Sequence, residues 1–194
     1  MSSSQPDFFA VPEPVKAIDV RYHSSSSYAP RTGENARSAD VTVAFATDYS
    51  TAGEKLTHRM AGSKYISVPL DMQIPEAAQR LADFMHQQHA RTLNVAGNGI
   101  YTLAKRRLTQ AGVNQWVFDV LKLVHADIRL DHIRSGGQTG VDTAGLVAGV
   151  ALGIPVTGLY PKGFRQRLAN QTDVSRSADD LVREIQAAAA ALRP

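Results

Sequence analysis

The residues with the clearest potential for chemistry lie in one glycine-rich stretch, Ser135-Gly136-Gly137-Gln138-Thr139-Gly140-Val141-Asp142. Its two adjacent glycines let the backbone turn sharply and approach a ligand without a Cβ in the way. The apolar run that follows, to Leu152, predicts a buried helix whose N-terminus offers free N–H groups and the positive end of a helix dipole. That arrangement suits a phosphate or a carboxylate, so we expect the stretch to bind an anionic ligand. The alternative is a tight turn that binds nothing.

This stretch is neither of the common nucleotide-binding loops. It lacks the Gly-Lys-Ser/Thr ending of a P-loop, so it supplies no lysine and no Mg²⁺-binding hydroxyl in place. It also lacks the Gly-x-Gly-x-x-Gly spacing of a dinucleotide-binding loop. The sequence therefore predicts a phosphate-binding loop of another kind.

Three further segments are expected to leave the carboxyl ends of strands and to meet the glycine-rich stretch at one edge of a sheet. They are residues 47–53, residues 97–99 and residues 160–165. Glycine amides would hold a phosphate there, and basic side chains would supply positive charge. The ligand-binding residues that we predict outside the glycine-rich stretch are Arg31, Thr51, Gly53, Gly97, Asn98, Gly99, Lys162 and Arg165.

Two carboxylates are the candidates for catalysis, Glu54 and Asp142. Cleavage of a glycosidic or phosphoester bond needs a general acid or base, which a carboxyl group can supply. Asp142 has an unusual position, because a carboxylate repels a phosphate. It would either accept hydrogen bonds from a ribose hydroxyl or a base, or cap its own helix.

Metal and nucleophile chemistry have little support in the composition. The chain has no cysteine, so disulfides, thiolate metal sites and cysteine nucleophiles are excluded. His86 and His89 have an i, i+3 spacing at the end of an expected helix, which we interpret as surface rather than metal binding. No Ser-His-Asp grouping is readable, and we expect no metal site.

Strands and helices are expected to alternate along the chain. Apolar or alternating runs predict strands at residues 18–22, 39–46, 65–70, 92–96, 132–134 and 156–159, the last of these being the final strand. One of the intervening helices is expected to carry Lys105-Arg106-Arg107 as a solvated face, and a closing helix begins near Ser177. This alternation predicts an α/β fold, with a Rossmann-like, doubly wound, mostly parallel sheet flanked by helices.

The composition fits one globular domain. The 194 residues suit a single domain over residues 18–194, preceded by a flexible arm of residues 1–17. The N-terminus has neither a basic start nor an apolar core, and the longest nearly uncharged run contains glycines and a proline. We therefore expect a cytoplasmic protein without a membrane span. A net charge of +3 fits a phosphorylated small molecule as partner, and we expect a homo-oligomer, a dimer or larger.

The glycine-rich stretch resembles a motif of the SLOG superfamily, which includes cytokinin-activating phosphoribohydrolases, the DNA-processing protein A family, YpsA-like proteins and molybdenum-cofactor carrier proteins. The resemblance is to the carrier and YpsA-like branch, through residues 135–142, 151–155 and 160–163. A second part of that branch's pattern resembles Arg31-Thr32, Asn35, Ala39-Asp40 and Thr42, followed by Thr51-Ala52-Gly53 and Leu56-Thr57. This part follows the glycine-rich part in the carriers and precedes it here, so we expect a circularly permuted chain.

The resemblance implies a Rossmann-like fold and a phosphorylated nucleotide or nucleotide-derived ligand, with a molybdopterin-type ligand also within the range of the superfamily. We expect a carrier, sensor or sequestering protein that binds this ligand at its glycine-rich loops. We also expect Gly137→Val to abolish ligand binding while the core of the fold survives, because a Cβ would fill the space that the ligand needs.

Two alternative functions stay open. One is a hydrolase that cleaves an N-glycosidic or phosphoester bond, although Ser50 to Glu54 does not reproduce the Pro-Gly-Gly-x-Gly-Thr-x-x-Glu motif of the phosphoribohydrolases. The other is a single-stranded DNA-binding protein of the DNA-processing type. The basic pI favours DNA slightly, but the sequence shows no stripe of basic residues interleaved with aromatics.

Overall fold

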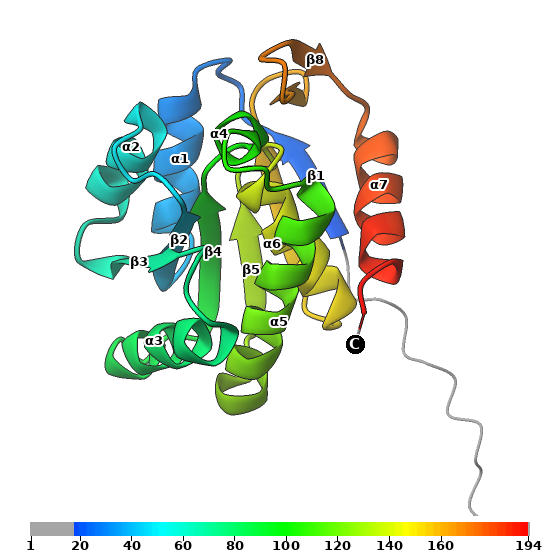
Figure 1. Ribbon diagram of the computed structural model, residues 1–194. Helices are drawn as coiled ribbons and strands as arrows, with labels where there is room; N and C mark the ends of the chain where they lie inside the picture. Colours follow the sequence, from blue (N-terminus) through cyan, green and yellow to red (C-terminus); the bar gives the residue numbers. More distant parts are fainter. Residues whose placement is uncertain (1–17, 194) are drawn as a thin grey trace, which may run out of the picture.

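The computed structural model describes residues 18–193, so the arm predicted at residues 1–17 lies outside the described part of the chain. Six strands form one sheet, in which all neighbouring strands are parallel. The prediction of a Rossmann-like α/β fold is confirmed (Figure 1). The strands are β1 (Ile18–Tyr22), β2 (Val41–Ala46), β3 (Tyr65–Pro69), β4 (Thr92–Gly97), β5 (His132–Ser135) and β6 (Val156–Tyr160), in the spatial order β1-β6-β5-β4-β2-β3.

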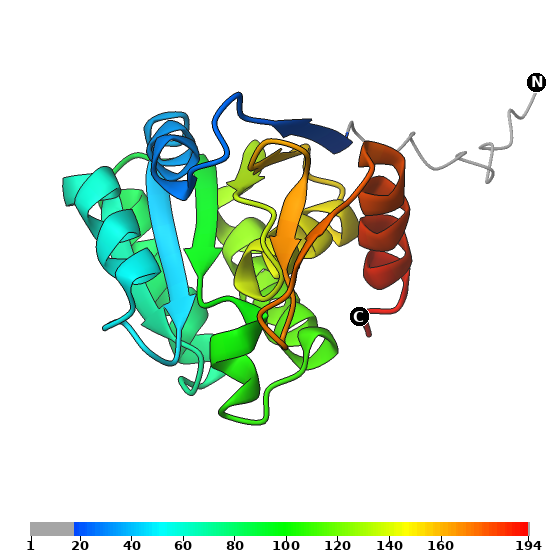
Figure 2. The same ribbon diagram turned by 90° about the horizontal axis from the view of Figure 1, so that it is seen from above.

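Helices cover the two faces of the sheet unequally (Figure 2). On one face lie α3 (Ile74–Gln87), α5 (Gln110–Ile128), α6 (Val141–Ala151) and α7 (Ala178–Ala190), and on the other lie α1 (Tyr28–Arg37) and α2 (Ala52–Ala61). The shorter elements are α4 (Ile100–Ala104) and a 3₁₀ turn, η1 (Gly62–Lys64).

The chain changes faces between two neighbouring strands. β2 leads into α2 on one side of the sheet, whereas β4, which pairs with β2, leads through α4 into α5 on the other side. Loops that leave adjacent strands in opposite directions open a crevice between them. Ligands bind in this crevice in doubly wound folds, so the topology places a candidate site above β2 and β4.

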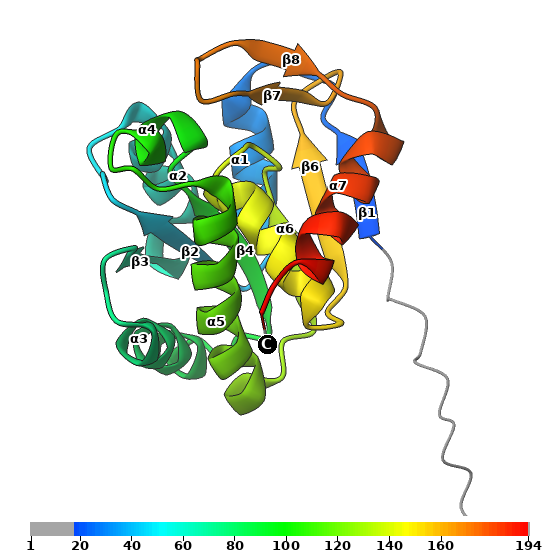
Figure 3. The ribbon, with the colours of Figure 1, turned by 45° about the vertical axis from the view of Figure 1, so that its right-hand side comes forward.

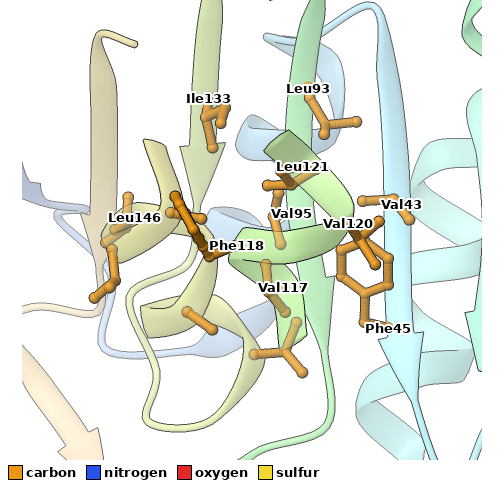
Figure 4. Close-up of a cluster of buried hydrophobic side chains, with 14 of the residues drawn as sticks. Val43, Phe45, Leu93, Val95, Val117, Phe118, Val120, Leu121, Ile133 and Leu146 are labelled. Atoms are coloured by element: carbon orange, nitrogen blue, oxygen red, sulfur yellow. The ribbon is translucent and has the colours of Figure 1, made fainter. Parts of the chain in front are cut away.

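The face that packs against α5 and α6, which we call the α5 face, carries the main hydrophobic core. Val43, Phe45, Leu93 and Val95 alternate along their strands toward these helices and are fully buried (Figure 4). α6 comes close to the sheet because it has a glycine at the contact. A Cβ on Gly145 would lie 2.6 Å from the Cβ of Val95. The buried helix predicted after the glycine-rich stretch is confirmed as α6.

The opposite face, which we call the α1 face, is polar across its middle. Thr42, Asn94, Arg134 and Thr157 are neighbours in register on four adjacent strands, and all four are buried. The Asn94 amide donates a hydrogen bond to the Thr42 hydroxyl at 3.2 Å. Buried sheet faces normally present apolar side chains, so this row is a first indication that the α1 face serves recognition.

α1 is a helix that the sequence pattern does not indicate. Pro30 and Gly33 lie within it, and both residues disfavour a helix interior. Pro30 is tolerated because it lies in the first turn, where its missing N–H has no helical acceptor. Gly33 is buried and packs near the Met60 side chain of α2, so tertiary contact outweighs local propensity here.

Two sequence-based predictions of secondary structure are wrong. Lys105-Arg106-Arg107 does not lie on a helix, because α4 ends at Ala104 and Arg107 has a left-handed φ of 60°. Residues 156–159 are not the final strand, because β7 (Arg165–Arg167) and β8 (Asp173–Ser175) form an antiparallel hairpin after it. The hairpin strands are only three residues long, which is too short for a readable alternation of apolar and polar residues. Within residues 18–193, no helix has both the length and the apolar character needed to cross a membrane.

Candidate functional site

A cavity of about 310 Å³ opens at the carboxyl edge of the sheet, in the crevice between β2 and β4. We call it the edge cavity. Its walls are the start of α2, the loop from β4 to α4, the glycine-rich loop between β5 and α6, and one side of α1. Figure 3 shows α1, α2 and α4 near the same end of the sheet. Three of the four segments that were expected to converge therefore do so. The fourth, residues 160–165, does not reach the cavity.

Most of the predicted site residues line the edge cavity. They are Arg31, Thr51, Gly53, Glu54, Gly97, Asn98, Gly99, Gly136, Gln138, Thr139 and Asp142. The predicted residues that do not line it are Ser135, Gly137, Gly140, Lys162 and Arg165.

The sequence analysis did not name several of the lining residues as site residues, among them Tyr28, Asn35, Asn94 and Arg167. Asn35 follows Arg31 by four residues, so assigning this segment to a helix would have placed both side chains on one face. Asn94 is a polar residue inside a predicted strand, and such a residue could have been recognised as a candidate site residue. Arg167 lies at the cavity because the β7–β8 hairpin folds over it, and no local sequence pattern predicts this hairpin.

Arg31 and Asp142 form a buried ion pair at the base of the glycine-rich loop. Nη1 of Arg31 lies 3.5 Å from Oδ2 of Asp142 and also donates a hydrogen bond to the carbonyl of Gly136. Burial raises the pKa of Asp142, and the Arg31 guanidinium partly offsets this effect. Gly136 is required for this packing, because a Cβ there would overlap the Arg31 guanidinium. The glycine therefore makes room for an arginine of the same chain.

Glu54 is a buried carboxyl at the first turn of α2. The Thr51 hydroxyl caps this helix by accepting a hydrogen bond from the Glu54 N–H at 3.2 Å. Burial raises the pKa of Glu54 to about 8, the negative charge of Asp142 adds to this shift, and the Asn98 amide opposes it. Glu54 is therefore mostly protonated at neutral pH and can donate a proton or a hydrogen bond.

Asn98 organises the loop that follows β2. Its Oδ1 accepts hydrogen bonds from the N–H groups of Thr47 and Asp48, each at 2.9 Å, and its Nδ2 donates to the Asp48 carbonyl at 2.9 Å. The same Nδ2 lies 3.5 Å from Oε1 of Glu54. The main contribution of this side chain is therefore to hold the two strand-end loops together and to orient Glu54.

The side chains of the glycine-rich loop hold the hairpin above it. Gln138 donates from Nε2 to the Arg165 carbonyl at 2.8 Å and accepts from the Arg167 N–H at 3.1 Å. Thr139 donates its hydroxyl proton to the Arg167 carbonyl. From the hairpin, Nε2 of Gln166 donates a hydrogen bond to the Gly137 carbonyl at 2.7 Å. These contacts place Arg167, rather than Lys162 or Arg165, at the rim of the edge cavity.

The start of α6 is largely satisfied by the protein itself. The N–H of Val141 donates to the Asn98 carbonyl at 3.2 Å, and the N–H of Gly140 donates to the Gln110 amide oxygen at 2.6 Å. The N–H of Gln138 lies 3.3 Å from the Asp142 carboxylate. The start of α2 differs, because Gly53 is exposed and a Cβ there would meet nothing within 4 Å. Space for an anion is therefore greater at α2 than at α6.

Gly137 is a packing requirement of the fold. Its φ is +69°, and a Cβ there would overlap the ring of Tyr160, a side chain that is 1% exposed. Gly137→Val would therefore strain the backbone and displace a core aromatic ring. The reason given for this variant in the sequence analysis is wrong, because a Cβ at Gly137 would meet the Tyr160 ring and Gly137 does not line the edge cavity. The variant is therefore not a clean probe of the site.

The described residues contain no group of three or more histidine, cysteine, aspartate or glutamate side chains that could hold a metal ion. The chemistry at hand in the edge cavity is that of two buried carboxyls, two arginines and several amide and hydroxyl groups.

Comparison with known protein families identifies the family of this chain. The model of the circularly permuted YpsA SLOG family matches residues 12–120 and 133–191. No curated protein matches the chain. The match covers both halves of the pattern discussed above, in the permuted order in which the sequence presents them. The chain therefore belongs to the circularly permuted YpsA family of the SLOG superfamily.

Proposed function

We propose that the protein binds a phosphorylated nucleotide or nucleotide-derived molecule in the edge cavity, as a carrier, sensor or sequestering protein. Family membership indicates a nucleotide-related ligand in general terms. The observation that carries the proposal is the convergence of the α2 start, residues 97–99 and the glycine-rich loop on one cavity at the switch point of the sheet.

The charges around the cavity indicate where an anionic group would bind. Arg31 and Arg167 are its two lining cations, and Arg31 is already paired with Asp142. Arg167 is half-exposed at the rim, where its guanidinium also contacts the Asp173 carboxylate at 2.8 and 3.0 Å. A phosphate near the rim would gain the Arg167 charge and the open N-terminus of α2.

A thermal-shift screen tests this proposal. The panel contains nucleoside monophosphates to triphosphates, cyclic nucleotides, ADP-ribose-type molecules and pterin phosphates. A ligand at about 100 times its dissociation constant should add about 2.7 kcal/mol to the free energy of unfolding. Arg167→Gln should reduce that gain, whereas Lys105→Gln, which alters a charge outside the cavity, should not. The absence of a shift with every phosphorylated compound at millimolar concentration would contradict the proposal.

A second candidate function is hydrolysis of the bound nucleotide, which the state of Glu54 favours. A buried carboxyl that keeps its proton near neutral pH is suited to protonate the leaving base as the N-glycosidic bond breaks. Water would add its hydroxyl to the ribose carbon, and the proton of that water would pass to Asp142, the other carboxyl nearby, or back to the Glu54 carboxylate. Incubating protein with nucleotide and measuring free base and phosphate distinguishes the functions. An intact nucleotide after prolonged incubation rules the hydrolase out.

A further inference from the structure

Unpaired polar atoms concentrate on one wall of the edge cavity. In residues 18–193, seven buried side-chain nitrogen or oxygen atoms have no hydrogen-bond partner. Four of them belong to residues that line this cavity: the Tyr28 hydroxyl, Nε of Arg31, Oδ1 of Asn35 and Oε2 of Glu54. Three lie on α1 and the fourth at the start of α2. Because proteins pair nearly all buried polar groups, such a cluster indicates groups that are kept for a ligand.

The chemical types of these four atoms restrict what can pair with them. The Arg31 Nε–H only donates, the Asn35 oxygen only accepts, and the Tyr28 hydroxyl does both. The Glu54 carboxyl donates while it is protonated, a state that burial favours up to a pH of about 8, its pKa. A phosphate dianion accepts hydrogen bonds but donates none, so it leaves the Asn35 oxygen unpaired. A group with both donors and acceptors satisfies all four.

The charge on this wall also opposes an anion. Asp142 lines the same cavity, and the positive charge of Arg31 is already shared between Asp142 and the Gly136 carbonyl. Placing a phosphate there would bring negative charge beside the buried Asp142 carboxylate in a region of low dielectric. The uncharged edge of a nitrogen heterocycle carries no such penalty.

We infer that the α1 wall of the edge cavity, formed by Tyr28, Arg31, Asn35 and Glu54, binds the uncharged nucleobase of the ligand by its hydrogen-bonding edge, while the phosphate lies outside toward Arg167. This inference rests on the proposed function. It reverses the orientation that the glycine-rich loop alone would predict, in which the phosphate enters first.

Binding measurements with ligand fragments test the orientation. Calorimetry compares adenosine, guanosine, cytidine and uridine with their 5′-monophosphates, with ribose 5-phosphate and with inorganic phosphate. The best nucleoside should bind within about tenfold of its monophosphate, because the base supplies the specific contacts. Ribose 5-phosphate and inorganic phosphate should bind at least about 100-fold more weakly, because they leave the buried wall unpaired.

Two variants should weaken the binding of different parts of the ligand. Asn35→Leu replaces an unpaired buried amide by an apolar side chain of similar size, so it should raise the melting temperature and lower nucleoside affinity at least about tenfold. Arg167→Gln should weaken the monophosphate and leave the nucleoside unchanged. Glu34→Gln on α1, which does not line the cavity, is the matched control.

Each failure has a distinct meaning. If ribose 5-phosphate binds as tightly as the monophosphates while no nucleoside binds, the inferred orientation is overturned and the proposed function stands. Equal nucleoside affinity of Asn35→Leu and the parent protein also overturns it. If none of these probes binds, the proposed function fails and the inference fails with it.

Discussion

On the α5 face the strands bury Phe45, Leu93 and Val95 against helices, whereas on the α1 face the same strands bury Thr42, Asn94 and Arg134. The first set is apolar and belongs to one cluster of buried hydrophobic side chains (Figure 4). The second set leads up to the edge cavity, where Arg31 and Glu54 are buried as well. One face of the sheet thus buries apolar side chains, and the other face buries polar side chains.

The main hydrophobic core and the proposed binding site therefore lie on opposite sides of the same strands. Apolar burial on the α5 face offsets the cost of unpaired polar groups on the α1 face. Alternation of side chains along a strand makes such a division possible, because each strand contributes to both faces. Variants on the two faces should therefore change different properties.

The largest effect is expected from Phe45→Ala on the α5 face. The Phe45 ring is fully buried and packs edge-on against Trp116, with centroids 5.3 Å apart. Its loss leaves a cavity and should lower the free energy of unfolding by about 4 kcal/mol, measured by urea denaturation. Ligand affinity of the folded protein should stay near the parent value. A parallel loss of affinity would show that the two faces are not separable.

Arg31→Met on the α1 face should cost somewhat less stability, about 3 kcal/mol at pH 8, because it leaves Asp142 as an unpaired buried carboxylate. The loss should shrink at lower pH, since burial raises the pKa of Asp142 and protonation removes the charge. Thermal denaturation of Arg31→Met alone and combined with Asp142→Asn provides the measurement. Parent-like stability of the single variant at pH 8 would show that the pair is unimportant.

Glu54 should make the protein less stable as the pH rises. Its pKa is raised from 4.5 to about 8 in the folded protein. Between these values the folded protein holds a proton that the unfolded chain has released, so stability falls by up to about 1.4 kcal/mol per pH unit. The fall ends above the folded pKa. Melting temperatures of the parent and Glu54→Gln over this window test it, because the glutamine variant should lose this component of the slope.

The smallest effect is expected from Lys162→Ala. Lys162 is exposed and does not line the edge cavity, so nucleotide affinity should change by less than about twofold in physiological salt. Arg167→Ala, which removes a lining cation, should weaken the nucleotide by about tenfold. Calorimetric titrations of both variants provide the comparison. A larger loss in Lys162→Ala would move the anion site away from the rim proposed here.

The sequence was a good guide wherever local pattern decides the structure. The buried helix α6, the strand before it and the convergence of strand-end loops all follow from apolar runs and glycines. The roles of the loop side chains do not follow from such patterns. Gln138 and Thr139 hold a hairpin more than 25 residues away in the chain, and Gly137 makes room for Tyr160.

The α1 wall shows why the remaining part of the site could not be predicted from the sequence. Arg31 was predicted, but Tyr28 and Asn35 come together with it only because the segment is helical. Pro30 and Gly33 mask that helix, which depends on packing against α2 and the sheet. The pKa of Glu54 likewise depends on Asp142, which lies 88 positions further along the chain.

We propose that a nucleotide binds at the carboxyl edge between α1, α2 and the glycine-rich loop. The most direct test is a titration of ¹⁵N-labelled protein with the best ligand of the thermal-shift screen, followed through the backbone amide shifts. The account predicts that the shifts concentrate at glycines that line the edge cavity, which are Gly53, Gly97, Gly99 and Gly136. It predicts little change at glycines outside it, which include Gly62, Gly112 and Gly153. Shifts that concentrate in the second set, or along α3 and α5, would contradict the account.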